Sequence, residues 1–253
     1  MRNRAQLINS LELYRQNQLS NSQMFPLDER LVTAWIFHDN LLEGRSFKPE
    51  HIQCALRRED QKQPSYLGPL LEDIRIYEQA ITKVWTWAQK GPSSLRLDHL
   101  QSLHKHLSQH EPKEGARVRT NSPVHRDYQQ KICSQTKVPR LLKEFFEDVH
   151  RFDVNTQDVL NYAAQLHHKL MFIYPYRRQP GNLARLFTNQ FLLAHRYPPM
   201  ILTSHERGIY YEALTAYDEV PLTQLFYRSA WHMIDSLPQE ARSSHTRLKA
   251  QVI

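Results

Sequence analysis

Apolar residues recur at helical spacing along most of this chain, and this feature limits its fold more than any other. In one stretch, alternating steps of four and three place five apolar residues on a single helix face: Val159, Ala163, Leu166, Leu170 and Ile173. The 253 residues include only six glycines, too few for an all-β protein with many tight turns. The pattern therefore predicts a mainly α-helical fold.

Further helices follow from the same kind of pattern. One covers RLLKEFFEDVHRF, and another begins near Leu183 and ends before two prolines. Asn155 or Thr156 is the expected N-cap of the helix between these two. Others are expected at about residues 28–42, 50–58, 69–89, 97–108, 206–217 and 221–236. The segment 117–127 combines β-branched residues with a Ser-Pro turn, which predicts an extended conformation.

The length fits one large domain or a domain with a small appendage. We expect an accessory helix in residues 1–29 and a polar tail in residues 238–253. No stretch has the apolar run of a signal peptide or a membrane span, which predicts no membrane partner. Cys54 and Cys133 form no CxxC pair and indicate a reducing compartment. We therefore expect a cytoplasmic protein; export without a cleaved signal stays open.

The charge balance allows several kinds of partner. Lys and Arg number 33 against 26 Asp and Glu, a formal net charge of +7. This excess suits polyanions such as nucleotides or nucleic acid, and it is also ordinary for a cytosolic protein. No DNA- or RNA-binding motif accompanies the charge, so nucleic-acid binding ranks third among the functions considered. The fourteen histidines show no metal-ligand spacing, and we predict no metal site.

The segment FIYPYRRQPGNLARLF, residues 172–187, stands out between two strongly apolar helical stretches. A glycine-containing turn that opens a helix presents backbone N–H groups to an anion, and the nearby arginines favour the same ligand. The alternative is a plain helical hairpin with arginines on its surface. The rigid apolar surroundings favour the anion site over the hairpin.

Residues 174–185, YPYRRQPGNLAR, resemble the signature of the Fic/Doc (Fido) family. That signature is His-Pro-Phe, one variable residue, Asp or Glu, Gly-Asn-Gly-Arg, two variable residues and Arg. WIFHDNLLEGRSFKPEHI, LDHLQSLHKHL, EGARVRTNSPV and RGIYYEALTAYDEVPLTQLFYRSAWHMIDSL are similar to other parts of the family, in the same order. The resemblance covers residues 30–237 and implies a mainly α Fido-type helical domain with a small β-hairpin flap at about 115–127.

The resemblance also implies a chemistry. Members of the family typically transfer AMP from ATP to a hydroxyl group of a target protein. The motif histidine is the general base, which suits imidazole near neutral pH. The acidic residue holds Mg²⁺ against the phosphates. The Gly-Asn-Gly turn and the helix N-terminus bind the phosphates through N–H groups, assisted by two arginines.

This chain departs from the signature at the positions that carry the chemistry. Tyr174 occupies the base position, and a phenol with an ordinary pKa of about 10 is a poor base near neutrality. Arg178 replaces the metal-binding carboxylate, so we expect no Mg²⁺ at the usual position. Gln179 and Pro180 replace Gly and Asn, and proline has no N–H to donate. Asn182 replaces the first arginine.

Other features of the signature remain. Gly181 and Arg185 are kept, and with Asn182 they are candidate phosphate-binding residues for ATP or another nucleotide. Arg177 and Arg178 are further candidates, because they could neutralise phosphate charge in place of a metal. His125 in the flap is the candidate for a substitute base. These residues keep open a transferase with rearranged chemistry.

A second motif concerns regulation. Many relatives carry an inhibitory helix with Ser or Thr, three residues, then Glu-Gly or Glu-Asn, whose Glu pairs with the second motif arginine. Residues 39–44 here are DNLLEG, in a helix at about 30–44, so Asp39 stands where Ser or Thr is expected. The resemblance implies a pair between Glu43 and Arg185 that blocks the outer phosphate. Alternatively, Glu43 only ends the helix and Gly44 is its C-cap.

The flap is the expected contact surface for a target protein. In the family its edge pairs with an extended segment of the target. Arg117, Arg119 and His125 are the candidate contact residues, and a solvated basic loop is the alternative.

Together these features predict a degenerate Fic-like protein, a pseudoenzyme that binds a nucleotide or a target protein and has lost standard AMP transfer. The alternative is an active nucleotidyl- or phosphoryl-group transferase with non-standard site residues. The donor nucleotide, the target and the oligomeric state stay open.

Overall fold

The computed structural model describes residues 4–20, 26–121, 123, 132–216 and 218–236. Within these residues the fold is built from α-helices: α1 (Arg4–Ser20), α2 (Glu29–Leu42), α3 (Pro49–Leu56), α4 (Gly68–Ala88), α5 (Leu97–Leu107), α6 (Val138–Arg151), α7 (Val159–Ile173), α8 (Pro180–Ala194), α9 (Arg207–Ala216) and α10 (Glu219–Ser236). Short 3₁₀ turns connect them: η1 (Asp60–Lys62), η2 (Ser65–Leu67), η3 (Pro92–Ser94), η4 (Pro112–Glu114), η5 (Gln135–Lys137) and η6 (Ser204–Glu206). The predicted mainly helical fold is confirmed.

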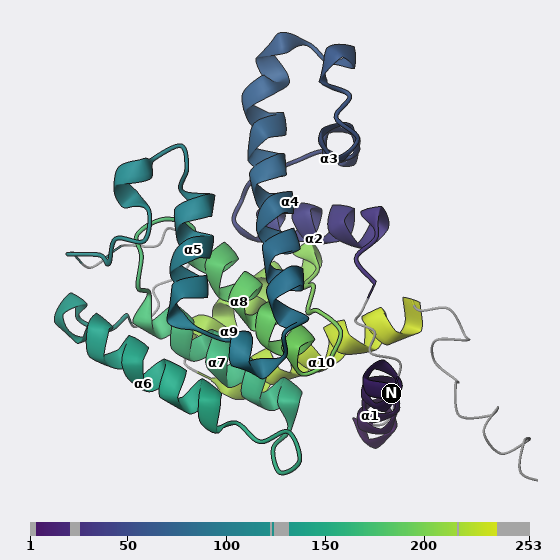
Figure 1. The fold of residues 1–253 in the computed structure, drawn as a ribbon, viewed down its shortest axis with the longest axis vertical. Coiled ribbons are helices and arrows are strands. Elements are labelled where there is room, and N and C mark those ends of the chain that lie inside the picture. Colours follow the sequence, from purple (N-terminus) through teal and green to yellow (C-terminus); the bar gives the residue numbers. More distant parts are fainter. Residues whose placement is uncertain (1–3, 21–25, 122, 124–131, 217, 237–253) are drawn as a thin grey trace, which may run out of the picture.

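Helix α8 lies at the centre of the fold (Figure 1). Every residue from Gly181 to Ala194 is buried. Helices α4 and α7 pack against α8, and α10 covers the other side of α7. Because α8 is enclosed on all sides, the loop that precedes it is held in a rigid frame.

Helix α7 begins later than predicted. Asp158 is its N-cap, and its side chain accepts hydrogen bonds from the N–H groups of Leu160 and Asn161, both at 3.0 Å. The expected caps Asn155 and Thr156 instead lie in the preceding turn, where the N–H of Asn155 donates to the side chain of Asp153. A carboxylate one turn nearer to the apolar stripe is the stronger cap, because it pairs with two N–H groups.

Helix α2 brings the predicted inhibitory motif to α8. The side chain of Asp28 caps its N-terminus by accepting from the N–H of Leu31 at 2.7 Å. Leu42 is its last residue, and Gly44 follows with a φ of +74°, a left-handed conformation that favours glycine. Buried apolar residues fix α2 against α3 and α4.

The accessory helix expected in residues 1–29 is α1, which packs against α10. The polar tail expected at 238–253 lies outside the described residues. No helix among the described residues has the length and apolar character needed to cross a membrane.

The predicted β-hairpin flap is not present among the described residues of this segment. Residues 115–121 and 123 contain no strand, and residues 122 and 124–131, which include His125, lie outside the described residues. Arg117 is exposed, as expected of a flap, but Arg119 is buried. The side chain of Arg119 is therefore not available on an exposed edge.

Candidate functional site

The motif segment 174–185 folds as a loop between two buried helices. Tyr174 follows the last residue of α7 and has a left-handed backbone, with a φ of +46°. Gln179 has a similar conformation, with a φ of +48°. Pro180 is the first residue of α8, where a missing N–H costs no intrahelical hydrogen bond. For this reason α8 begins at Pro180 rather than near Leu183.

Arg119 binds the backbone of this loop. Its Nε donates to the carbonyl of Tyr174 at 2.7 Å, and its Nη2 donates to the carbonyls of Cys133 and Ile173. Its backbone N–H donates to the carbonyl of Pro175 at 3.0 Å. A cation at the C-terminal end of α7 also complements the helix dipole. Arg119 thus acts as a brace for the motif loop, a role that the sequence pattern did not predict.

Arg185 is the cation at the centre of the site. Its side chain is buried, with 1% of its surface exposed. Its Nη2 donates to Glu43 Oε1 at 2.7 Å, so the predicted Glu43–Arg185 pair is present. Its Nε forms a second ion pair, with Asp39, and its Nη1 donates to the hydroxyl of Tyr210 at 3.1 Å. One guanidinium is therefore bound by two carboxylates.

Asp39 was not predicted as a partner of Arg185, although its position carried a signal. Asp39 and Glu43 are four residues apart, which brings them to one face of α2. The second carboxylate oxygen of Asp39 accepts a hydrogen bond from the hydroxyl of Tyr77 on α4. Burial raises the pKa of Asp39 to about 6, against the attraction of Arg185. At neutral pH Asp39 is still mainly ionised.

Gly181 is the point where α2 comes closest to the first turn of α8. A Cβ atom at this position would lie 2.0 Å from Glu43 Oε1 and 2.9 Å from Arg185 Nη1, so a larger residue here requires the Glu43 carboxylate to move. The carboxylate of Glu43 therefore lies over the helix N-terminus, where an anion would otherwise bind. Beside it, Asn182 Oδ1 accepts from Arg185 Nη2 at 3.3 Å. Asn182 Nδ2 is buried and has no hydrogen-bond partner among the described residues.

We expect Gly181→Ala to lower the free energy of unfolding by about 1–3 kcal/mol, because the new methyl group displaces the Glu43 carboxylate from Arg185. Urea unfolding measures the change. Most of the loss should be recovered in a Glu43→Ala background, where the closest atom is removed. Gly208→Ala in α9 is the matched control, since no atom lies within 4 Å of its Cβ position. An equal loss in both backgrounds would contradict the proposed contact.

Tyr174 is poorly suited to accept a proton. Its side chain is buried, and burial together with the nearby charge of Glu43 raises the pKa of its phenol to about 12. At neutral pH the phenol stays protonated, so it can donate a hydrogen bond but cannot act as a general base.

Two of the three arginines of the motif, Arg177 and Arg178, lie on the surface. Arg178 Nη2 pairs with Glu111 Oε2 at 2.7 Å, and both side chains are about half exposed. Arg177 is exposed and forms no ion pair with any residue that the structure describes. A cation at the position of the metal-binding carboxylate does not fit Mg²⁺, which prefers oxygen ligands.

A buried histidine supports Arg185 from the opposite side. His167 Nε2 lies 3.0 Å from the Tyr210 hydroxyl, and His167 Nδ1 lies 3.3 Å from Thr188 Oγ1. Burial, followed by the charge of Arg185, lowers the pKa of His167 to about 3, so the ring is neutral. Tyr210 can then accept from Arg185 and donate to His167, while Thr188 donates to the carbonyl of Ala184 at 2.8 Å. The chain of donors and acceptors fixes the guanidinium in place.

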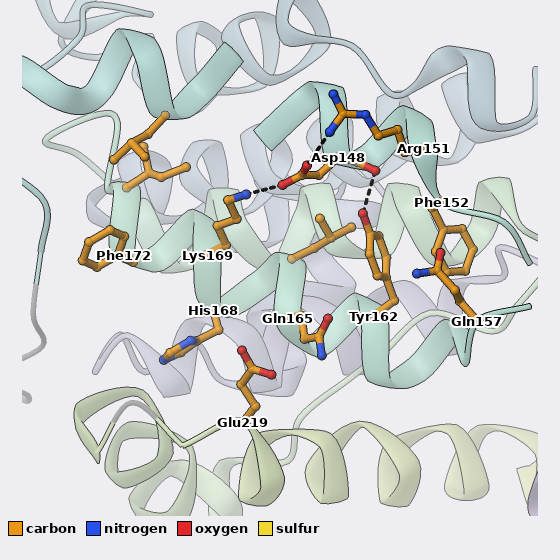
Figure 2. Close-up of a pocket in the computed structure, with 13 residues that line it drawn as sticks. Asp148, Arg151, Phe152, Gln157, Tyr162, Gln165, His168, Lys169, Phe172 and Glu219 are labelled. Atoms are coloured by element: carbon orange, nitrogen blue, oxygen red, sulfur yellow. Dashed lines mark hydrogen bonds and ion pairs between the residues drawn. The ribbon is translucent and has the colours of Figure 1, made fainter. Parts of the chain in front are cut away.

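The structure also contains an open groove of about 450 Å³ between α6, α7 and the start of α10 (Figure 2). None of the motif residues 174–185 lines it. Its lining carries two carboxylates, Asp148 and Glu219, and two cations, Lys169 and Arg151, and Asp148 pairs with both cations. Nothing in this arrangement selects a ligand of one charge, so the site around Arg185 and Gly181, where α2 meets α8, is the better candidate.

Residues 94–192 match the model of the Fic/DOC family. The chain is 23% identical over 189 residues to the protein adenylyltransferase Fic of Nematostella vectensis, which covers 71% of this chain and 42% of the relative. It is 27% identical over 133 residues to the protein adenylyltransferase fic-1 of Caenorhabditis elegans, or 49% of this chain and 24% of the relative. The chain thus spans less than half of the length of these relatives.

Solved structures agree with this match. The structure of Fic-1 from C. elegans matches this chain at a TM-score of 0.70 and 18% identity. The match covers 91% of this chain and 70% of the Fic-1 chain. A Fic-domain-containing signaling protein from Bacteroides thetaiotaomicron matches at a TM-score of 0.72 and 16% identity. This match covers 94% of this chain and 96% of the other chain. At these identities the likeness establishes the fold. The predicted resemblance to the Fic/DOC family is confirmed.

Proposed function

We propose that this Fic-like chain is a pseudoenzyme that binds a nucleotide or a target protein and has lost standard AMP transfer. The single observation that supports this most strongly is the state of Arg185. The cation that the family resemblance assigns to the outer phosphate is buried and paired with both Asp39 and Glu43. An incoming phosphate would have to displace at least one carboxylate from a site with little access to water.

The chemistry of the loop supports the same proposal. AMP transfer needs a group that accepts the proton of the target hydroxyl, and Tyr174, with a pKa of about 12, does not accept it near neutrality. It also needs a cation to neutralise the phosphates that leave, and Arg178 is engaged by Glu111 on the surface. The missing proton acceptor and the missing free cation do not depend on α2, so both would remain if α2 moved away from Arg185.

Some features of an anion site are retained. Gly181 leaves room above the first turn of α8, and Asn182 has a buried amide nitrogen without a described partner. Such a group favours an acceptor as ligand, because a buried unpaired donor costs about 1–3 kcal/mol. These features support binding of a phosphate-bearing ligand without transfer. The exposed Arg117 is the remaining described candidate for contact with a target protein.

The test is incubation of the purified chain with ATP labelled at the α-phosphate, with and without Mg²⁺ or Mn²⁺. We expect no label on the chain, because Tyr174, at the base position, does not accept the proton near neutral pH. We expect the same of Glu43→Ala, since removal of this carboxylate opens the site but supplies no base.

Labelling of either protein would contradict the proposal. Tyr174→Phe then shows whether the motif loop is responsible, because this change removes only the phenolic hydroxyl. Loss of the label in Tyr174→Phe would establish the alternative, a transferase with rearranged site residues. GTP, UTP and CDP-choline, labelled in the transferable group, extend the test to other donors.

A further inference from the structure

Asp39 differs from Glu43 in how firmly it is held. Asp39 lies within α2, and its side chain is 6% exposed. Its two carboxylate oxygens are bound by groups on two different helices, Arg185 on α8 and Tyr77 on α4. Its backbone carbonyl also lies 3.4 Å from Arg185 Nη2. Release of Asp39 from Arg185 by side-chain rotation would also break its hydrogen bond to Tyr77.

Glu43 is placed where it can move. It follows the last residue of α2, its side chain is 14% exposed, and the left-handed Gly44 comes next. A change in its side-chain torsions alone would take the carboxylate off Gly181 without disturbing α2. The two carboxylates therefore bind the same guanidinium but have different freedom.

The charges of the three side chains do not balance. Arg185 carries one positive charge, while Asp39 and Glu43 carry two negative charges, so the cluster has a formal charge of −1 when all three are ionised. The inhibitory motif that the sequence resembles has Ser or Thr at the position of Asp39, and such a cluster would be neutral. When Glu43 leaves, the cluster here becomes neutral rather than positive. A neutral pair attracts a phosphate far less than a free guanidinium does.

We propose that Asp39 is a second inhibitory carboxylate. It stays paired with Arg185 and keeps this cation unavailable to a polyphosphate even when the Glu43 carboxylate has moved away. This inference rests on the proposed function, because it explains how the retained anion site stays closed. It assigns different roles to the two carboxylates. Glu43 covers the N-terminus of α8, whereas Asp39 cancels the charge of Arg185.

The test is calorimetric titration of the purified protein with ATP and, separately, with inorganic tripolyphosphate, without metal. We compare the wild type with Glu43→Ala, Asp39→Ser and the double variant. Neither single change should give more than weak binding, since one carboxylate still neutralises Arg185. The double variant should bind both ligands about tenfold more tightly than either single variant, the value expected for one charge-assisted hydrogen bond.

Asp39→Asn is the matched variant, because it keeps the shape of the side chain and removes its charge. In a Glu43→Ala background it should reproduce the binding of the Asp39→Ser double variant, and circular dichroism confirms that each protein is folded. The inference is wrong when Glu43→Ala alone binds as tightly as the double variants, or when none of them binds. Labelling from ATP would contradict the proposed function instead, so the two failures can be told apart.

Discussion

Replacement of Arg185 by methionine is expected to lower the free energy of unfolding by about 3–5 kcal/mol. Methionine fills nearly the same volume, so the loss measures the charge and not a cavity. Asp39 and Glu43 would be left close together in a buried site without a cation. Urea unfolding, followed by circular dichroism, measures the change.

The control is the same substitution in a chain that also carries Asp39→Asn and Glu43→Gln. All three groups are then neutral, and we expect most of the stability to return, because a buried charge network can be replaced by neutral groups at small cost. If Arg185→Met alone does not fold, recovery of folding in this triple variant is the readout. Arg140→Met, at an exposed pair with Glu144, should change stability little. Equal, small losses at Arg140 and Arg185 would contradict the role of the cluster.

Lowering the pH should decrease the free energy of unfolding already at pH values well above the range in which ordinary carboxylates titrate. Burial lowers the pKa of His167 to about 3 and that of His104 to about 4, while both take up a proton near 6.5 in the unfolded chain. Between these values the unfolded state binds more protons, so stability falls as pH falls. For two such residues we expect a loss of about 3 kcal/mol between pH 6.5 and 5. Urea unfolding at a series of pH values measures it.

Single variants show which residues cause this dependence of stability on pH. His167→Gln and His104→Gln should each remove the part of the slope that its own ring contributes, whatever their effect on stability at neutral pH. Asp39→Asn should steepen it, because a pKa raised to about 6 makes ionised Asp39 unfavourable, and this contribution acts in the opposite direction. A slope unchanged in both histidine variants would show that neither ring stays neutral in the folded protein.

The helices were predictable because their patterns are local. Expected ranges such as 97–108 and 69–89 agree closely with α5 and α4. Errors occurred where a cap decides the boundary: Asp158 displaced the start of α7, and Pro180 extended α8. The β-hairpin flap was expected from resemblance and not from a strong local pattern, and its described part contains no strand.

For the site, the sequence identified the residues but not all of their partners. The Glu43–Arg185 pair followed from the resemblance and is present. Asp39 was noted only as a departure from the motif, and its bond to Arg185 was not foreseen. Arg119 was assigned to an exposed edge but is buried beneath the motif loop. These contacts join residues far apart in the chain, which periodicity does not report.

The order of residues by itself determined that this chain forms helices, that a glycine-containing turn lies between two of the most apolar ones, and that the motif has no histidine or acidic residue at its key positions. Only the tertiary structure decided that two carboxylates share Arg185 and that Glu43 lies over Gly181. The physical reason is that helix formation depends on neighbours within a few turns. The charge state of a buried site depends on which distant groups enclose it and exclude water.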